Sequence, residues 1–130
     1  MDAAEAVYAK YRDDINFLIV YTVEAYPYGS ACPYTGEETE VFSSKDTLGF
    51  ALTQPKNYKE RVFQAKEFLR QLGYTMPMVV DDIDNAIWCT YGPASNIAYL
   101  IDTDGKVLVK QAYYSPEEMD AEIAGYLQGR

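Results

Sequence analysis

Apolar residues recur along the chain in two different periods, which predict helices and strands. Spacings of three and four residues predict a helix over Asp2–Arg12 and another between Pro55 and Gly73. Pro55 suits the start of a helix, and Gly73 suits its end. A short helix is expected over Asp82–Tyr91, and a last helix begins at Ser115, an N-cap followed by proline and two acids. The expected buried stripes are Ala4, Val7, Tyr8 and Tyr11 in the first helix, Val62, Ala65, Phe68, Leu69 and Leu72 in the second, and Met119, Ile123 and Leu127 in the last.

Three further stretches predict strands. Asn16–Val23 is a nearly continuous apolar run, typical of a strand buried on both faces, and Met76–Val80 is a second such run. Asn96–Tyr113 predicts a hairpin with a tight turn at Asp104-Gly105. Because strands alternate with helices before the hairpin, the order predicts an α/β fold. Its mixed sheet would have about four strands, three parallel and one antiparallel, flanked by helices.

The length of 130 residues suits one domain, residues 1–130. Within it, residues 26–54 form a long connection that contains several proline and glycine breakers. A connection of this length is more often a functional loop or an insertion than a simple link.

The charge and hydropathy of the chain exclude several classes of partner. A net charge of -9 without clustered Lys and Arg argues against nucleic acids and anionic membranes. No apolar run approaches the roughly 20 residues of a membrane span, and the acidic amphipathic start does not resemble a signal peptide. Two cysteines do not make a disulfide framework, so we expect a cytoplasmic protein.

The sequence contains no histidine, which removes the commonest general base and the commonest metal ligand. Ser-His-Asp and Cys-His nucleophile activation are therefore excluded, and a zinc site would need more cysteines than Cys32 and Cys89. We expect no metal and no bound cofactor.

Four motifs lie between Phe17 and Lys110: "FLIVYTVEAYP", "PYTGEE", "QPKNYKERVFQAKEFL" and "MPMVVDDIDNAIWCTYGPASNIAYLIDTDGKVLVK". Together they resemble the iodothyronine deiodinase family, in particular its bacterial deiodinase-like members within the thioredoxin-like redoxin superfamily. The resemblance covers about residues 8–127. The resemblance implies a thioredoxin-like fold and reductive chemistry. In that chemistry a selenocysteine or cysteine attacks a halogen or another acceptor group, and a thiol reductant regenerates it as co-substrate.

The match to the family's functional residues is partial. Tyr21 and Glu24 match the Tyr and Glu at the family's strand end, and Arg61 matches its helix Arg. Tyr26 stands where the family has His, and Pro55 aligns with a second His of the vertebrate enzymes. The family's first strand and its nucleophile have no equivalent in this sequence.

In the parent fold that first strand lies in the middle of the sheet. We therefore expect the strands at 17–23 and 98–102 either to pair directly or to be completed by a second chain, and we favour a homodimer.

Glu24 is the strongest catalytic candidate, because open α/β sheets place ligands at the carboxyl ends of their strands. A partly buried carboxylate there could donate a proton, or it could simply bind loop amides. Tyr21 and Tyr26 would be its neighbours, although packing with a hydrogen-bonded hydroxyl is an equally ordinary role for tyrosine.

Cys32 could be a resolving or substitute nucleophile, but acids follow it in the sequence and no second cysteine lies at C-x-x-C spacing. Cys89 fits a small buried side chain in a helix. Tyr28 and Tyr34, together with Arg61, are candidates for binding an aromatic or thiol substrate, whereas a partly wet core is the alternative role for the tyrosines.

Acidic residues near 81–85 and 102–104 lack the spacing of a calcium-binding loop. Helix capping by the first group and turn formation by the second explain both.

Two functions therefore remain open. The first is a deiodinase-like thiol or selenol oxidoreductase, incomplete in this chain and dependent on another segment or partner for its nucleophile. The second is a non-catalytic thioredoxin-like binding module that uses the tyrosine-rich loop and the strand ends.

Overall fold

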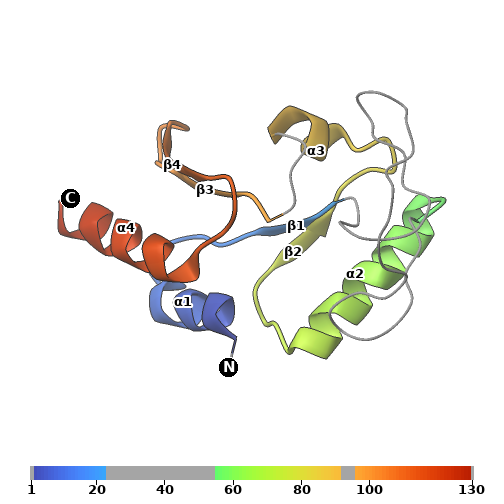
Figure 1. Ribbon diagram of the computed structural model, residues 1–130, viewed down its shortest axis with the longest axis horizontal. Coiled ribbons are helices and arrows are strands. Elements are labelled where there is room, and N and C mark those ends of the chain that lie inside the picture. Colours follow the sequence, from blue (N-terminus) through green and yellow to red (C-terminus); the bar gives the residue numbers. More distant parts are fainter. Residues whose placement is uncertain (1, 23–54, 92–95, 130) are drawn as a thin grey trace. The chain divides into compact units, whose positions relative to one another are not determined.

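The computed structural model describes residues 2–22, 55–91 and 96–129 (Figure 1). In this part the protein is a mixed α/β structure with four helices and two small sheets of two strands each. The elements are α1 (Ala3–Tyr11), β1 (Ile19–Tyr21), α2 (Tyr58–Leu72), β2 (Met78–Val80), α3 (Ala86–Tyr91), β3 (Ala98–Ile101), β4 (Val107–Gln111) and α4 (Pro116–Gln128). They fall into two compact units, one of Met1–Asn16 with Ala94–Arg130 and the other of Phe17–Pro93.

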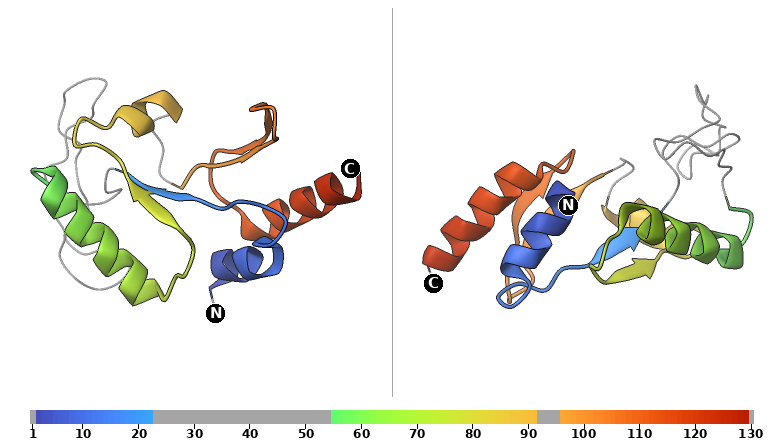
Figure 2. Two further views of the ribbon diagram at one scale, coloured as in Figure 1. Left: turned by 180° about the vertical axis from the view of Figure 1, so that it is seen from behind. Right: turned by 90° about the horizontal axis from the view of Figure 1, so that it is seen from below.

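In the first unit, α1 and α4 lie side by side although they are at opposite ends of the sequence (Figure 2). Asp2 caps α1 by accepting a hydrogen bond from the Ala4 amide at 2.8 Å. Ser115 caps α4, whose first residue is Pro116, as the sequence predicted. The buried apolar side chains of the two helices are Val7, Tyr11, Met119 and Ile123, all members of the predicted stripes.

The same unit contains the hairpin β3–β4, which is antiparallel and pairs Tyr99 with Lys110. Asp102 Oδ1 accepts hydrogen bonds from the amides of Asp104 and Lys106, each at 2.9 Å. Gly105 has φ 83°, a left-handed conformation that suits glycine. The predicted turn and the predicted turn role of these acids are therefore confirmed.

In the second unit, β1 and β2 form a parallel pair in which Tyr21 lies opposite Val80. The Ile19 amide donates to the Pro77 carbonyl and the Asp81 amide donates to the Tyr21 carbonyl, both at 2.9 Å. The helix α2 packs against β2 (Figure 2).

Both ends of α2 follow the rules for helix termini. Asn57 caps the first turn by accepting from the Glu60 amide at 2.9 Å. Gly73, with φ 69°, ends the helix as predicted. Local sequence chemistry thus determines where this helix begins and ends.

The predicted four-stranded sheet is wrong, because the described strands form two separate two-stranded sheets. The predicted run Asn16–Val23 gives only a three-residue strand, whose side chains are half-buried rather than buried on both faces. An apolar run favours extended backbone, but the partner of a strand is determined by contacts distant in sequence. The predicted helix over Asp82–Tyr91 is also shorter, since its first residues form the turn before α3.

The predicted long connection over residues 26–54 lies outside the described residues. None of the helices that the structure describes is long and apolar enough to cross a membrane.

Candidate functional site

The candidate site is the carboxyl edge of the β1–β2 pair. Because the two strands are parallel, both carboxyl ends meet at this edge, where open α/β sheets bind ligands. Tyr21 ends β1, and Asp81 directly follows β2. The chain that leaves β1 here leads to Glu24, which lies outside the described residues, as do Tyr26, Tyr28, Cys32 and Tyr34.

Tyr21 belongs to an aromatic cluster between β1 and α2. Its ring packs edge-on against Phe68, with centroids 5.7 Å apart and planes at 61°. Phe68 in turn packs edge-on against Tyr74 at 5.8 Å. This arrangement agrees with the packing role considered for Tyr21, and its predicted catalytic role stays a prediction.

Arg61 is buried, with 2% of its surface exposed, and its guanidinium reaches from α2 to the turn after β2. Nη1 donates to the carbonyl of Asp81 at 3.3 Å and to that of Asp82, and Nη2 donates to Asn85 Oδ1 at 2.8 Å. Asn85 has φ 62°, a left-handed conformation that asparagine tolerates. Arg61 therefore ties α2 to the Asp81–Asn85 turn.

Asp81 carries this connection onward to α3. Its carboxylate is buried and accepts hydrogen bonds from the Ile87 amide at 3.0 Å and the Trp88 amide at 2.9 Å. A carboxylate at a helix start satisfies amides that have no partner within the helix. The predicted capping role of the acids near residue 81 is therefore confirmed for Asp81.

Cys89 is half-buried on α3, and its amide donates to the Asn85 carbonyl at 2.9 Å. Its predicted place in a helix is confirmed. Among the residues that the structure describes, no group of three potential metal ligands comes together.

The structural role of Arg61 was missed from the sequence, which suggested substrate binding. One signal was present: Arg61 stands four residues before Ala65, on the same face of α2 as the predicted buried stripe. Its predicted contact with substrate stays a prediction. The helix α2 places both residues: the Tyr21 ring packs against Phe68 of this helix, and Arg61 is itself one of its residues.

No protein-family model matches the sequence, and a comparison with characterised proteins gives no match.

Proposed function

We propose that this chain is the deiodinase-like, thioredoxin-type part of a thiol or selenol oxidoreductase that works at the carboxyl edge of β1–β2. The observation that supports the proposal best is the parallel register of these strands, which brings Tyr21 and Asp81 to one edge. Glu24 follows β1 by three residues in the sequence. A proton donor at such an edge would stand where α/β proteins place reacting ligands.

The proposed reaction reduces an aromatic iodide with two thiol equivalents. The carbon–iodine bond breaks and iodide leaves, while the carbon takes a proton to give the arene. The two thiols lose two electrons and two protons and form a disulfide, so that one proton goes to the carbon and one to solvent. Glu24 would deliver the proton to the carbon.

The attacking thiol or selenol comes from another segment or from a partner, because no residue of this sequence aligns with the family's nucleophile. A second copy of the chain has the same sequence and cannot supply it, so in a test of the chain alone dithiothreitol provides both thiols. Tyr28, Tyr34 and Tyr26 would surround the aromatic ring of the substrate.

Iodide release from 3,5-diiodotyrosine, measured with and without dithiothreitol, tests this proposal. The expected result is iodide release that depends on both protein and reductant and yields one disulfide equivalent for each iodide. Release at the rate of the protein-free control would contradict the proposal.

A non-catalytic binding module is the second candidate, and one observation favours it. The side chains of Arg61, a candidate for substrate binding, and Tyr21, a candidate for catalysis, are engaged in hydrogen bonding and ring packing within the unit. Calorimetric titration with 3,5-diiodotyrosine separates the two functions. Saturable binding without iodide release supports the module, whereas binding with release supports the enzyme.

A further inference from the structure

The turn of the β3–β4 hairpin is held by one residue, Asp102. The consecutive amides of Asp104, Gly105 and Lys106 all donate to it. Asp102 Oδ1 accepts from Asp104 and Lys106 at 2.9 Å each, and the Asp102 carbonyl accepts from Gly105 at 3.1 Å. The Asp102 amide in turn donates to the Lys106 carbonyl at 2.9 Å. Asp102 therefore holds the peptide groups on both sides of the bond between Asp104 and Gly105.

That bond belongs to a reactive type of dipeptide. The sequence contains one Asp-Gly pair and no Asn-Gly pair. In an Asp-Gly pair the glycine nitrogen can attack Cγ of the aspartic acid, because glycine has no side chain to hinder the approach. A carbon–nitrogen bond forms, and the amide proton leaves with the carboxyl OH as water, which gives a five-membered succinimide. Water then opens the ring at either carbonyl and yields aspartate or isoaspartate.

We propose that Asp104 is a site of isoaspartate formation, and that Asp102 controls the rate of this reaction by holding the turn closed. In the closed turn the proton of the Gly105 amide lies in the bond to the Asp102 carbonyl. Ring closure requires this proton to leave, so the turn must first open locally. Asp104 and Gly105 are exposed, so water reaches the bond directly. The inference does not depend on the proposed function, because its measurements need no substrate.

The control exerted by the turn is tested by ageing the wild-type chain beside a synthetic peptide of residues 101–108 at neutral pH. Chymotrypsin releases the same segment from the aged chain by cleavage after Leu100 and Leu108. Chromatography with mass spectrometry then separates aspartate from isoaspartate at residue 104. Because the closed turn protects the bond, the rate in the chain is expected to be at least about fivefold lower than in the peptide. Equal rates would overturn the proposal without any variant.

Asp102→Ala tests the role of the carboxylate, which accepts two of the three amides. Loss of these hydrogen bonds increases the open fraction of the turn, so the isoaspartate rate should rise by at least about fivefold. Asp102→Asn keeps an acceptor oxygen without the charge and should give an intermediate rate. Hydrogen exchange at the Gly105 amide should rise by the same factor in each variant, because both reactions need the same opening.

Tyr11→Phe is the matched control for global unfolding. It removes the bond from Tyr11 to Asp120 in the same unit and leaves the hairpin turn intact. Its isoaspartate rate should stay within about twofold of the wild-type rate, because the local opening is unchanged. A rise as large as in Asp102→Ala would assign the reaction to global unfolding and overturn the proposal, as would an unchanged rate in Asp102→Ala. If Asp102→Ala does not fold, the wild-type chain, the peptide and Tyr11→Phe still decide the outcome.

Discussion

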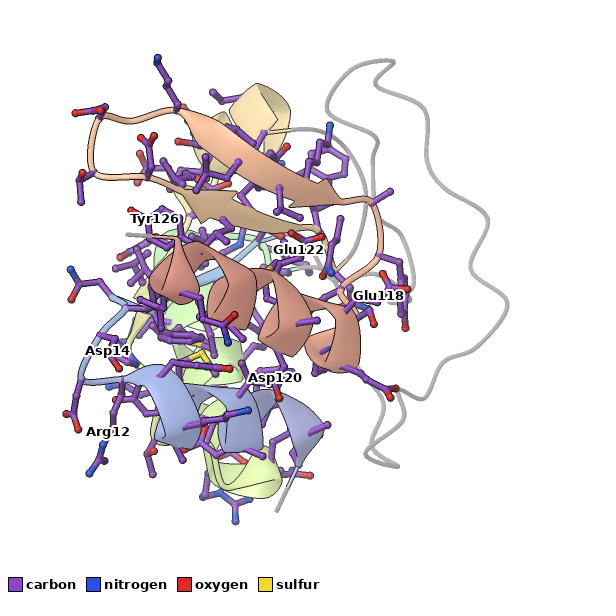
Figure 3. All side chains as sticks on the ribbon, turned by 90° about the vertical axis from the view of Figure 1, so that its left-hand side faces the viewer. Arg12, Asp14, Glu118, Asp120, Glu122 and Tyr126 are labelled. Atoms are coloured by element: carbon purple, nitrogen blue, oxygen red, sulfur yellow. The ribbon has the colours of Figure 1, made fainter. Side chains whose placement is uncertain are left out.

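The Tyr11 hydroxyl donates a hydrogen bond to Asp120 Oδ1 at 2.5 Å and so joins two helices whose residues are 109 positions apart. Lys10 binds both oxygens of the same carboxylate, at 2.8 and 3.1 Å. Figure 3 shows Asp120 on α4 with α1 beside it. This contact joins α1 and α4 through polar groups within the first unit.

Tyr11→Phe is therefore expected to destabilise the protein by about 1–2 kcal/mol, because it removes the hydroxyl and with it a partly buried hydrogen bond to a charged carboxylate. Urea unfolding followed by circular dichroism measures the change. Tyr113→Phe is the matched control, since Tyr113 is 69% exposed, and it should leave the free energy of unfolding within about 0.5 kcal/mol. Equal effects of the two variants would remove the role assigned to this bond.

The Lys10–Asp120 contact also predicts a pH dependence of stability. Hydrogen bonds from Lys10 and Tyr11 lower the pKa of Asp120, and hydrogen bonds to Asp120 and Tyr11 raise the pKa of Lys10. The Asp120 contribution is complete above the pKa of the unfolded state, about 4, and is lost as the pH falls through the lower pKa of the folded state. The Lys10 contribution is complete below about pH 10 and is lost as the pH rises further.

The difference in unfolding free energy between the wild type and Asp120→Asn should accordingly be largest between about pH 5 and pH 9. It should shrink at lower pH, as measured by urea titrations across the acid range. A difference that stayed constant from about pH 7 to about pH 2 would contradict this assignment.

Asp81→Asn tests the cap of α3. The amide side chain keeps one acceptor oxygen but loses the charge and the second acceptor, so one α3 amide loses its partner. Hydrogen exchange at the Ile87 and Trp88 amides should accelerate by about tenfold or more, whereas exchange at Ala65 in α2 should change little. Asp84→Asn is the control, since Asp84 is an exposed acid in the same turn. Acceleration by both variants alike would assign the effect to charge rather than to capping.

Two glycines of the first unit, Gly105 and Gly125, predict changes in stability of opposite sign when they are replaced by alanine. Gly105 has φ 83°, and a methyl group on its Cα would meet open space, so Gly105→Ala should cost about 1 kcal/mol through backbone conformation alone. Gly125 lies within α4 and also has open space, so Gly125→Ala should stabilise the protein by about 0.5–1 kcal/mol. Thermal unfolding of both variants measures these shifts, and shifts of the same sign would contradict the conformational argument.

Features that depend on neighbouring residues could be predicted from the sequence. Ser115 and Gly73 mark helix ends, and Asp102 with Gly105 forms the hairpin turn, because capping and turn chemistry act over two to four residues. The shared orientation of β1 and β2 also followed from the helix between them.

Features that depend on distant residues could not be predicted. The periodicity of Asn16–Val23 carries no information about which strand pairs with it, and the expected four-stranded sheet is two separate pairs. The Tyr11–Asp120 bond and the reach of Arg61 to the turn at Asp81 likewise join residues far apart in sequence. At the candidate site, both strands could be predicted from their apolar runs, but the arginine that joins α2 to the turn after β2 could not.

The measurement that tests the proposed function most directly is dithiothreitol-dependent iodide release from 3,5-diiodotyrosine by the wild type, Glu24→Gln and the control Glu37→Gln. Loss of a proton donor predicts that Glu24→Gln falls at least about 100-fold in turnover while Glu37→Gln keeps the wild-type rate. Wild-type turnover in Glu24→Gln, or equal losses in both variants, would contradict the proposed site at the carboxyl edge of β1–β2.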